Sequence, residues 1–349
     1  MDFWNRLINR ETDMKQTNQT SDIDFVIAWV DGSDKAWLNE KSKYQADAMH
    51  EDDSNARYRD WDNLKYWFRS VEQYAPWVRM IHFVTWGHVP AWLDVDNPRI
   101  HIVRHEDYIP HEYLPTFNSH TIELNLHRIP GLAERFVYFN DDMFLNRPVL
   151  PEDFFGDGLP CDIMGLDCIA FGKNSAGCFN ANDVGLINDH FDVSTCFRQH
   201  KSKWLNIRYG MKVPVRTLFL LKKGYFTGFY YQHTTSGFLK QTFTEVWEKE
   251  CEVLDDTCSC RFRNQTNVNQ WLMKYWQLAK GNFCPRKKKF GMYFQIKDDT
   301  SGITEAIKTE KYEVICLNDT GTVKDFDKVR DEICMAFEEK FPQRSGFEI

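Results

Sequence analysis

A nearly continuous apolar run, IDFVIAWV at Ile23–Val30, constrains the fold more than any other feature of this chain. A strand with one face in water would alternate apolar and polar residues. This run has instead the length and composition of a strand that is covered on both faces. Such strands are typical of parallel sheets, in which crossover helices pack on the two faces. The run therefore predicts a strand inside a parallel sheet.

Further strands and helices follow in alternation. Three more strands are predicted at Val78–Trp86, Arg99–His105 and Arg135–Phe139. Helical spacing of apolar residues predicts helices at Arg59–Ala75 and Asn118–Ile129, the second beginning at an asparagine that can cap it. This order predicts an α/β fold, an open sheet with helices on both faces.

The two ends of the chain and its second half are less regular. Residues 1–22 are polar and predict a flexible tail. In the second half, apolar stripes predict helices at Asn267–Gly281 and Val323–Pro342, whose stripes fit core packing better than a partner groove.

Composition excludes several classes of function. With 43 basic and 51 acidic residues the net charge is −8, which argues against a non-specific nucleic-acid binder. The cysteines lack the paired C-x-x-C spacing of a zinc site, although Cys251, Cys258, Cys260 and Cys284 leave structural zinc as a minor alternative. Reduced cysteines fit a cytoplasmic protein, and no run approaches the ~18 apolar residues of a membrane span.

Two segments leave a peripheral membrane contact open. Phe3, Trp4, Leu7 and Ile8 can form a short apolar face, and Arg286–Lys289 is a run of cations. A frayed tail and a solvated charged surface are the favoured readings. Contact with an anionic membrane is the alternative for each.

The strand at Arg135–Phe139 ends abruptly on Asn140, Asp141 and Asp142. Open α/β sheets bind ligands beyond the carboxyl ends of their strands, where this acidic pair would emerge. Adjacent carboxylates repel and suit a hard divalent cation, and since neighbouring residues of an extended chain point apart, one of the two would meet it. A plain surface turn is the alternative.

Three other sites carry candidate chemistry. Asp31 and Gly32 follow the first strand, where a glycine lets backbone N–H groups approach a ligand, although a simple turn is equally compatible. His233 lies among aromatic residues, where a structural role is commoner than a catalytic one. Arg263 suits a bidentate phosphate contact. The P-loop, G-x-S-x-G and H-E-x-x-H patterns do not occur, which disfavours P-loop kinases, serine hydrolases and zincins.

Taken together, these segments resemble the Stealth family of sugar-phosphate transferases, which includes bacterial capsule polymerases and the animal lysosomal-enzyme N-acetylglucosamine-1-phosphotransferase. Four blocks carry the resemblance in order: IDFVIAWVDGSD (23–34); residues 57–93 continuing through LPTFNSHTIELNLHRIPGLAERFVYFNDDMFL (114–145); QHTTSGFLK (232–240) with residues 261–281; and ICLNDT (315–320) reaching FPQRSGFE (341–348).

The resemblance implies a Rossmann-like sheet of the nucleotide-sugar transferase type and a divalent cation, Mg²⁺ or Mn²⁺. It implies catalytic roles for Asp142, His233 and Arg263, with residues 23–150 binding the donor and residues 151–349 completing the site. Metal ligands would come from Asp141, Asp142 and Asp319, the last with a helix cap as its alternative. Donor-binding residues would be Asp31, Gly32, Arg59, Asn63, Arg69, Asn118 and Asn140, although Arg69 equally suits a structural ion pair.

The implied reaction moves a hexose-1-phosphate or N-acetylhexosamine-1-phosphate from a UDP-sugar to a hydroxyl of an oligo- or polysaccharide acceptor, with release of UMP. Its place would be capsule or exopolysaccharide synthesis, in the cytoplasm or at the inner face of the membrane beside membrane-bound capsule machinery. The alternatives are a metal-dependent glycosyltransferase that releases UDP and a non-catalytic sugar- or nucleotide-binding protein.

Overall fold

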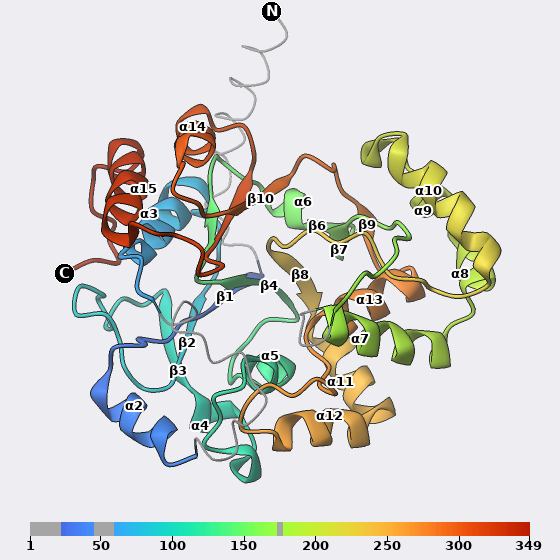
Figure 1. Ribbon diagram of the computed structural model, residues 1–349, viewed down its shortest axis with the longest axis horizontal. Helices are drawn as coiled ribbons and strands as arrows, with labels where there is room; N and C mark the ends of the chain where they lie inside the picture. Colours follow the sequence, from blue (N-terminus) through green and yellow to red (C-terminus); the bar gives the residue numbers. More distant parts are fainter. Residues whose placement is uncertain (1–21, 45–58, 173–176) are drawn as a thin grey trace, which may run out of the picture.

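A five-stranded sheet forms the centre of the molecule (Figure 1), in a computed structural model that describes residues 22–44, 59–172 and 177–349. The tail expected at 1–22 lies outside the described residues apart from Asp22. The strand order is β3-β2-β1-β4-β8. Parallel strands are β1 (Ile23–Ala28), β2 (Ile81–Thr85), β3 (Ile100–Arg104) and β4 (Arg135–Asn140), and β8 (Ser236–Leu239) runs antiparallel to β4.

Helices cover both faces of this sheet, as the apolar run of β1 predicted. Phe25 and Ile27 pack into one hydrophobic cluster, which includes α3 (Leu64–Tyr74) and α15 (Phe326–Lys340). Val26, between them, packs into a second cluster on the other face. Helices α5 (Ser119–Leu124), α11 (Lys240–Lys249), α12 (Cys251–Ser259) and α13 (Trp271–Lys280) contribute to this second cluster. The predicted α/β fold is confirmed.

The chain then changes sheets at the acidic pair. After β4 ends at Asn140, β5 (Met143–Leu145) enters a second sheet of order β10-β11-β5. There β5 pairs antiparallel with β11 (Val314–Asn318), which pairs in parallel with β10 (Gly291–Gln295). The turn of Asp141 and Asp142 therefore connects two sheets, and the two carboxylates leave the core at the junction.

Helix boundaries differ in places from those predicted. Helix α3 begins at Leu64, after a turn, and not at Arg59. The helix expected to reach Ile129 ends at Leu124 and continues as a short 3₁₀ turn. The Asn125 side chain donates to the carbonyl of Thr121 (2.8 Å). In a continuing helix this carbonyl would accept from the backbone N–H of residue 125, so the side chain competes with the helical hydrogen bond.

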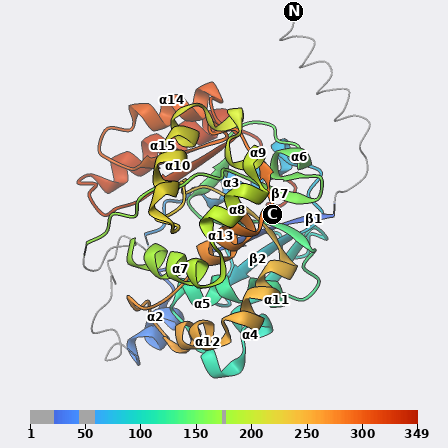
Figure 2. The ribbon, with the colours of Figure 1, turned by 90° about the vertical axis from the view of Figure 1, so that its right-hand side faces the viewer.

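The remaining elements flank these two sheets, and Figure 2 looks onto the side where α7 to α10 lie. They are α2 (Lys35–Ser42), α4 (His105–Tyr108), α6 (Pro151–Phe154), α7 (Gly177–His190), α8 (Val193–Gln199), α9 (Lys201–Trp204), α10 (Lys212–Leu220), α14 (Ser301–Thr309) and a small sheet of β6 (Phe155–Gly156), β7 (Leu159–Asp162) and β9 (Cys284–Pro285). Among the described helices, none combines the length and the apolar character that crossing a bilayer requires.

Candidate active site

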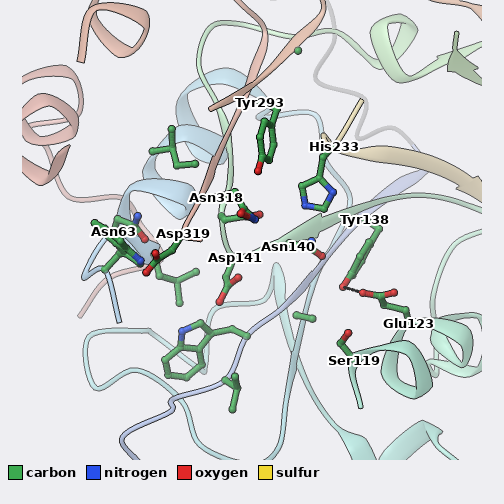
Figure 3. A pocket seen from close by; sticks show the side chains of 18 of the residues that line it. Asn63, Ser119, Glu123, Tyr138, Asn140, Asp141, His233, Tyr293, Asn318 and Asp319 are labelled. Carbon is green, nitrogen blue, oxygen red and sulfur yellow. Dashed lines mark hydrogen bonds between the residues drawn. The ribbon is translucent and has the colours of Figure 1, made fainter. Parts of the chain in front are cut away.

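A cavity of about 1490 Å³ opens beyond the carboxyl ends of the parallel strands. Ala28 at the end of β1, Val84 on β2 and Asn140 at the end of β4 contribute to its wall, as do residues 317–320 at the end of β11. In Figure 3, Asp141 and Asp319 lie on one side of this cavity and Glu123 and Tyr138 on the other, with His233 and Tyr293 above them. The edge of the sheet at which the sequence predicts a ligand site therefore borders a cavity.

The structure brings Asp142, His233 and Arg263 into the wall of this one cavity. Asp142 comes from the turn between the two sheets, His233 from the segment that precedes β8, and Arg263 from the loop after α12. The three side chains are far apart in sequence, so their meeting depends on the fold. The fold thus gathers an acid, an imidazole and a guanidinium, the three side chains for which the resemblance implies catalytic roles.

The Asp142 carboxylate is held by the second sheet. Its Oδ2 accepts a hydrogen bond from the Cys316 thiol (3.3 Å), because β5 and β11 pair Met143 with Cys316. Its Oδ1 is buried and has no hydrogen-bond partner among the residues that the structure describes. Burial, and to a smaller extent the charge of Asp141, raises the pKa of Asp142 to about 7. One oxygen is therefore available to a ligand.

A cation fits this turn, although with a donor set that differs from the expected one. Asp142, His233 and Cys316 present ligand atoms that all lie within 4.8 Å of one another. Asp141 and Asp319 also line the cavity, but within the described ranges they do not join Asp142 in a group of this kind. Asp142 therefore lies beside an imidazole and a thiol, and the roles of Asp141 and Asp319 as metal ligands stay predictions.

The chemistry of the donors favours a hard cation on Asp142. Burial raises the pKa of the Cys316 thiol well above its ordinary value, so at neutral pH it stays protonated and donates to Asp142. Mg²⁺ and Mn²⁺ prefer oxygen ligands, which the carboxylate supplies and a protonated thiol does not. The residues present thus fit a hard divalent cation held by Asp142.

Asp319 has a different setting from either expectation. Its Oδ1 accepts from the backbone N–H of Gly321 (2.7 Å), and Asp325, not Asp319, caps α15. Its buried Oδ2 lies 3.8 Å from Nη1 of Arg59, and within the described part of the chain neither atom has a hydrogen-bond partner. Arg59 and Asp319 both line the cavity, so these two atoms can form hydrogen bonds with a ligand.

His233 is a neutral imidazole in this setting. Burial, and to a smaller extent the charges of Lys274 and Arg263, lowers its pKa to about 4. Its Nδ1 hydrogen-bonds with the hydroxyl of Tyr231 (2.9 Å). The ring is neutral near pH 7 because desolvation disfavours the imidazolium.

Arg263 is positioned by a residue that was itself expected to bind the donor. Asn118 does not reach the cavity; its fully buried side chain donates to the carbonyls of Cys260 and Phe262 (both 3.2 Å). The loop that carries Arg263 is therefore tied to the start of α5, where Nη2 of Arg263 donates to the Ser119 hydroxyl (2.5 Å). The expectation that Asn118 binds the donor is therefore corrected: Asn118 holds the loop that carries Arg263.

The other donor-binding expectations divide into two groups. Arg59, Asn63 and Asn140 line the cavity. Asp31 and Gly32 do not, because Asp31 closes its own turn: its Oδ1 accepts from the backbone N–H and the hydroxyl of Ser33 (2.8 and 2.7 Å). The plain turn, which the sequence left open as an alternative, is what these contacts describe.

Arg69 is directed away from the cavity and forms a structural ion pair. Nε and Nη2 donate to the two carboxylate oxygens of Glu348 (2.8 and 2.9 Å), and Nη1 donates to the carbonyl of Phe341 (2.7 Å). The guanidinium is buried. The expectation that Arg69 serves the donor is wrong, and its alternative, the ion pair, is what the structure shows.

Replacing Arg69 by alanine should therefore destabilise the fold without changing donor binding. Loss of one partner leaves the Glu348 carboxylate buried and unpaired, which typically costs about 3 kcal/mol or more. Urea unfolding should show this loss, while the donor KM of the folded fraction stays unchanged. Arg330→Ala on α15, which removes exposed pairs with Asp327 and Asp331, should change the urea midpoint little. A raised donor KM at normal stability would return Arg69 to the site.

Glu123 is the cavity residue that the sequence did not reveal. It is buried on α5, its Oε1 lies 3.4 Å from the hydroxyl of Tyr138, and burial raises its pKa to about 7. The Arg263 charge opposes that rise. Ser119 and Glu123 stand four residues apart on one helix, so the helical period could have placed both on the face toward Arg263.

Cations gather at another part of the wall. Lys288, Lys289 and Lys311 line the cavity, which supplies the local positive charge that an anionic ligand needs in a chain of net charge −8. Arg286 differs from its neighbours because it is buried over the ring of Phe290. The run at Arg286–Lys289 is therefore only partly the solvated face that the sequence favoured.

Comparison with known proteins places this cavity in a family. Models of Stealth protein conserved regions 1 and 2 match residues 21–47 and 57–161. The capsular polysaccharide phosphotransferase WcwK of Streptococcus pneumoniae is 43% identical over 328 residues, which cover 93% of this chain and 98% of that protein. The chain belongs to the Stealth family.

Two further relatives of this Stealth protein span the same length. The receptor polysaccharide phosphotransferase WefC of Streptococcus gordonii is 38% identical, with 94% of this chain and 99% of that protein covered. The exopolysaccharide phosphotransferase cps2G of Lactiplantibacillus plantarum is 39% identical, with 95% and 98% covered. Among solved structures, the galactosyltransferase LgtC with donor and acceptor sugar analogs gives a TM-score of 0.37 at 12% identity, over 89% of this chain and 95% of that one.

Proposed function

We propose that this Stealth protein transfers a hexose-1-phosphate or N-acetylhexosamine-1-phosphate from a UDP-sugar to a hydroxyl of a glycan acceptor, in capsule or exopolysaccharide synthesis. The observation that carries the proposal is the meeting of Asp142, His233 and Arg263 in one cavity whose wall also holds lysines. Relatives over nearly the full length, all named as phosphotransferases, support the same reaction class.

In this reaction the acceptor oxygen attacks the phosphorus atom that carries the sugar. The acceptor O–H bond breaks and an O–P bond forms, while the bond from that phosphorus to the bridging oxygen breaks and UMP leaves. The acceptor proton passes to a base in the cavity. The product is a sugar phosphodiester, and the anomeric carbon keeps its bond to oxygen throughout.

Phosphoryl transfer depends mainly on positioning and on compensating the charge of the phosphate oxygens. Arg263, with its hydrogen bond to Ser119, is our candidate for the equatorial oxygens of the transferred phosphate. A divalent cation held by Asp142 would supply further positive charge to the diphosphate. Arg59 and Asn63, on the side of Asp319, remain our candidates for the rest of the donor.

Two residues can accept the acceptor proton. The resemblance implies a catalytic role for His233, whose neutral imidazole can accept a proton at Nε2 in the tautomer in which Nδ1–H donates to Tyr231. Its pKa of about 4 makes it a weak base. Glu123, with a pKa of about 7, is the stronger one, and its position near Arg263 favours it as a second candidate.

A pH–rate profile of kcat/KM should separate these two candidates. Asp142 and Glu123 both have a pKa of about 7, and Asp142 must be ionised to hold a cation. If Glu123 is the base, two groups must lose a proton, so the rate below pH 7 should rise more steeply than tenfold per unit and level above it. Glu123→Gln should reduce the slope to about tenfold per unit, and His233→Gln should leave it unchanged. An unchanged slope in Glu123→Gln would contradict the assignment. The other groups that interact with Glu123 are Arg263, Tyr108, Tyr138 and Asp183.

We further propose that residues 23–349 act as one catalytic domain, at or near the inner face of the cell membrane. The first half supplies Asp142 and the donor-side residues, and the second supplies His233, Arg263 and Asp319 to the same cavity. Strand β8, from the second half, also extends the sheet of the first.

The released nucleotide tests the proposal. The full-length protein is incubated with Mg²⁺ or Mn²⁺, a panel of UDP-sugars and an oligosaccharide primer. UMP together with a phosphodiester signal in ³¹P NMR is the expected result. Release of UDP without a phosphodiester would support the glycosyltransferase alternative, and no donor consumption would support a binding protein.

A further inference from the structure

Helix α10 and the turns around it expose bulky apolar side chains to water. Ile207 is 92% exposed, Met211 83%, Val215 62% and Phe219 66%, and Leu218 and Tyr225 are exposed as well. The inner face of the same helix is already buried through Val213, Thr217 and Leu220. A surface helix normally presents polar residues on its outer side, so this second apolar side is unusual. We call these six exposed residues the α10 face.

The α10 face lies at the edge of the molecule. In Figure 1, α8, α9 and α10 form a group on the right, beside the central sheet, and Figure 2 shows α10 in front on that side. Met211, Val215 and Leu218 follow one another at spacings of four and three residues, which places them along one side of a helix. The exposed side chains therefore form a stripe.

Positive charge predominates around the α10 face, although Asp167 pairs with Arg216 of α10 (2.7 Å). Residues 193–244 contain no aspartate or glutamate, although the whole chain has a net charge of −8. The exposed cations on or beside the stripe are Lys201, Arg208, Lys212, Lys222 and Lys223. Apolar side chains among an excess of cations are the composition of a helix that lies in the interface of an anionic bilayer. Protein interfaces are instead poor in lysine.

We propose that the α10 face docks on the surface of an anionic phospholipid bilayer. The apolar stripe would enter the boundary between headgroups and acyl chains, and the lysines would meet the lipid phosphates. This docking is independent of the transfer reaction proposed above, since none of the six residues lines the cavity.

The docked orientation would bring the cationic part of the cavity wall near the lipid. The carbonyl of Arg208 accepts from the backbone N–H of Lys288 (3.2 Å), and Nη1 of Arg208 donates to the carbonyl of Pro285 (2.9 Å). Lys288 and Lys289 line the cavity, so the turn that begins the α10 face supports the cationic part of its wall. If the proposed reaction holds, an acceptor at the membrane surface would lie on this side.

Co-sedimentation of the full-length chain with vesicles tests the docking without any catalysis. The vesicles are phosphatidylcholine alone or with roughly one third phosphatidylglycerol. We expect binding to the anionic vesicles and little to the neutral ones. Combined Met211→Ser, Val215→Ser and Phe219→Ser should weaken binding at least tenfold, and combined Lys212→Gln, Lys222→Gln and Lys223→Gln about fivefold per lysine.

A control carries the same changes elsewhere. Combined Leu38→Ser, Val95→Ser and Met335→Ser, at exposed apolar residues on other elements, should leave vesicle binding unchanged. The lysine variant keeps the apolar stripe, so it remains informative if the serine variant does not fold. Wild-type binding by both α10 variants, or no binding of the unaltered chain, would overturn the proposal. Self-association without lipid that the α10 variants abolish would also overturn it, by identifying a protein interface.

Discussion

Replacing Asp142 by asparagine is expected to lower turnover by about 10²–10³-fold while the protein remains folded. The substitution keeps the size of the side chain and an oxygen that can accept from the Cys316 thiol, but it removes the negative charge that would hold a cation. Since burial already raises the pKa of this carboxyl to about 7, a neutral amide should cost the fold nothing. Initial rates would measure turnover, thermal unfolding would measure stability, and calorimetric titration with Mn²⁺ would measure cation binding.

Cys316→Ala is the matched variant for this experiment, because it removes the neighbouring ligand atom and leaves the charge in place. If the cation is hard and held by Asp142, the rate and Mn²⁺ affinity of Cys316→Ala should stay within a few fold of wild type. An equal loss in both variants would favour a softer metal bound by the group of Asp142, His233 and Cys316. A wild-type rate in Asp142→Asn would remove this carboxylate from the mechanism.

The first half of the fold could be predicted because its strands carry their information locally. The four parallel strands are short runs of apolar residues between turns, and a strand buried on both faces needs nothing else to be recognised. Strand β8 and the sheet of β5, β10 and β11 depend on pairing between segments far apart in sequence. Met143 pairs with Cys316 between two such strands, and the composition of either strand does not predict its partner.

The residues of the candidate site also divide into those that local sequence predicts and those that depend on contacts between distant segments. Asp142 could be predicted from its place at the end of a strand, since that edge of an open sheet is where ligands bind. The resemblance of motifs then pointed to His233 and Arg263. The role of Cys316 beside Asp142 follows from strand register, and the raised pKa of Glu123 follows from burial that only the packed structure supplies. Charged residues on a helix, such as Arg69, are ambiguous because their partners lie at the other end of the chain.

Loss of Arg263 should be the second large effect, a decrease in kcat/KM of about 10²–10³-fold in Arg263→Ala. A guanidinium that lines the cavity can bond two phosphate oxygens at once, and the tie from Asn118 to the carbonyl of Phe262 holds the loop for that purpose. Arg263→Lys should recover only part of the rate, because an ammonium lacks the planar fork. Single-turnover assays with a UDP-sugar would measure both variants.

Arg261 gives the matched control, two residues away in the same loop. Its Nη1 donates to the carbonyl of Pro115 (3.0 Å) and its guanidinium does not line the cavity, so Arg261→Ala should keep the rate within a few fold. The pH profile offers an independent check. The Arg263 charge lowers the pKa of Glu123, so in Arg263→Ala the rise in rate that depends on Glu123 should move to higher pH. Equal losses in both arginine variants with no shift would mean that the loop matters for its shape alone, and Arg263 would then have no direct role at the phosphate.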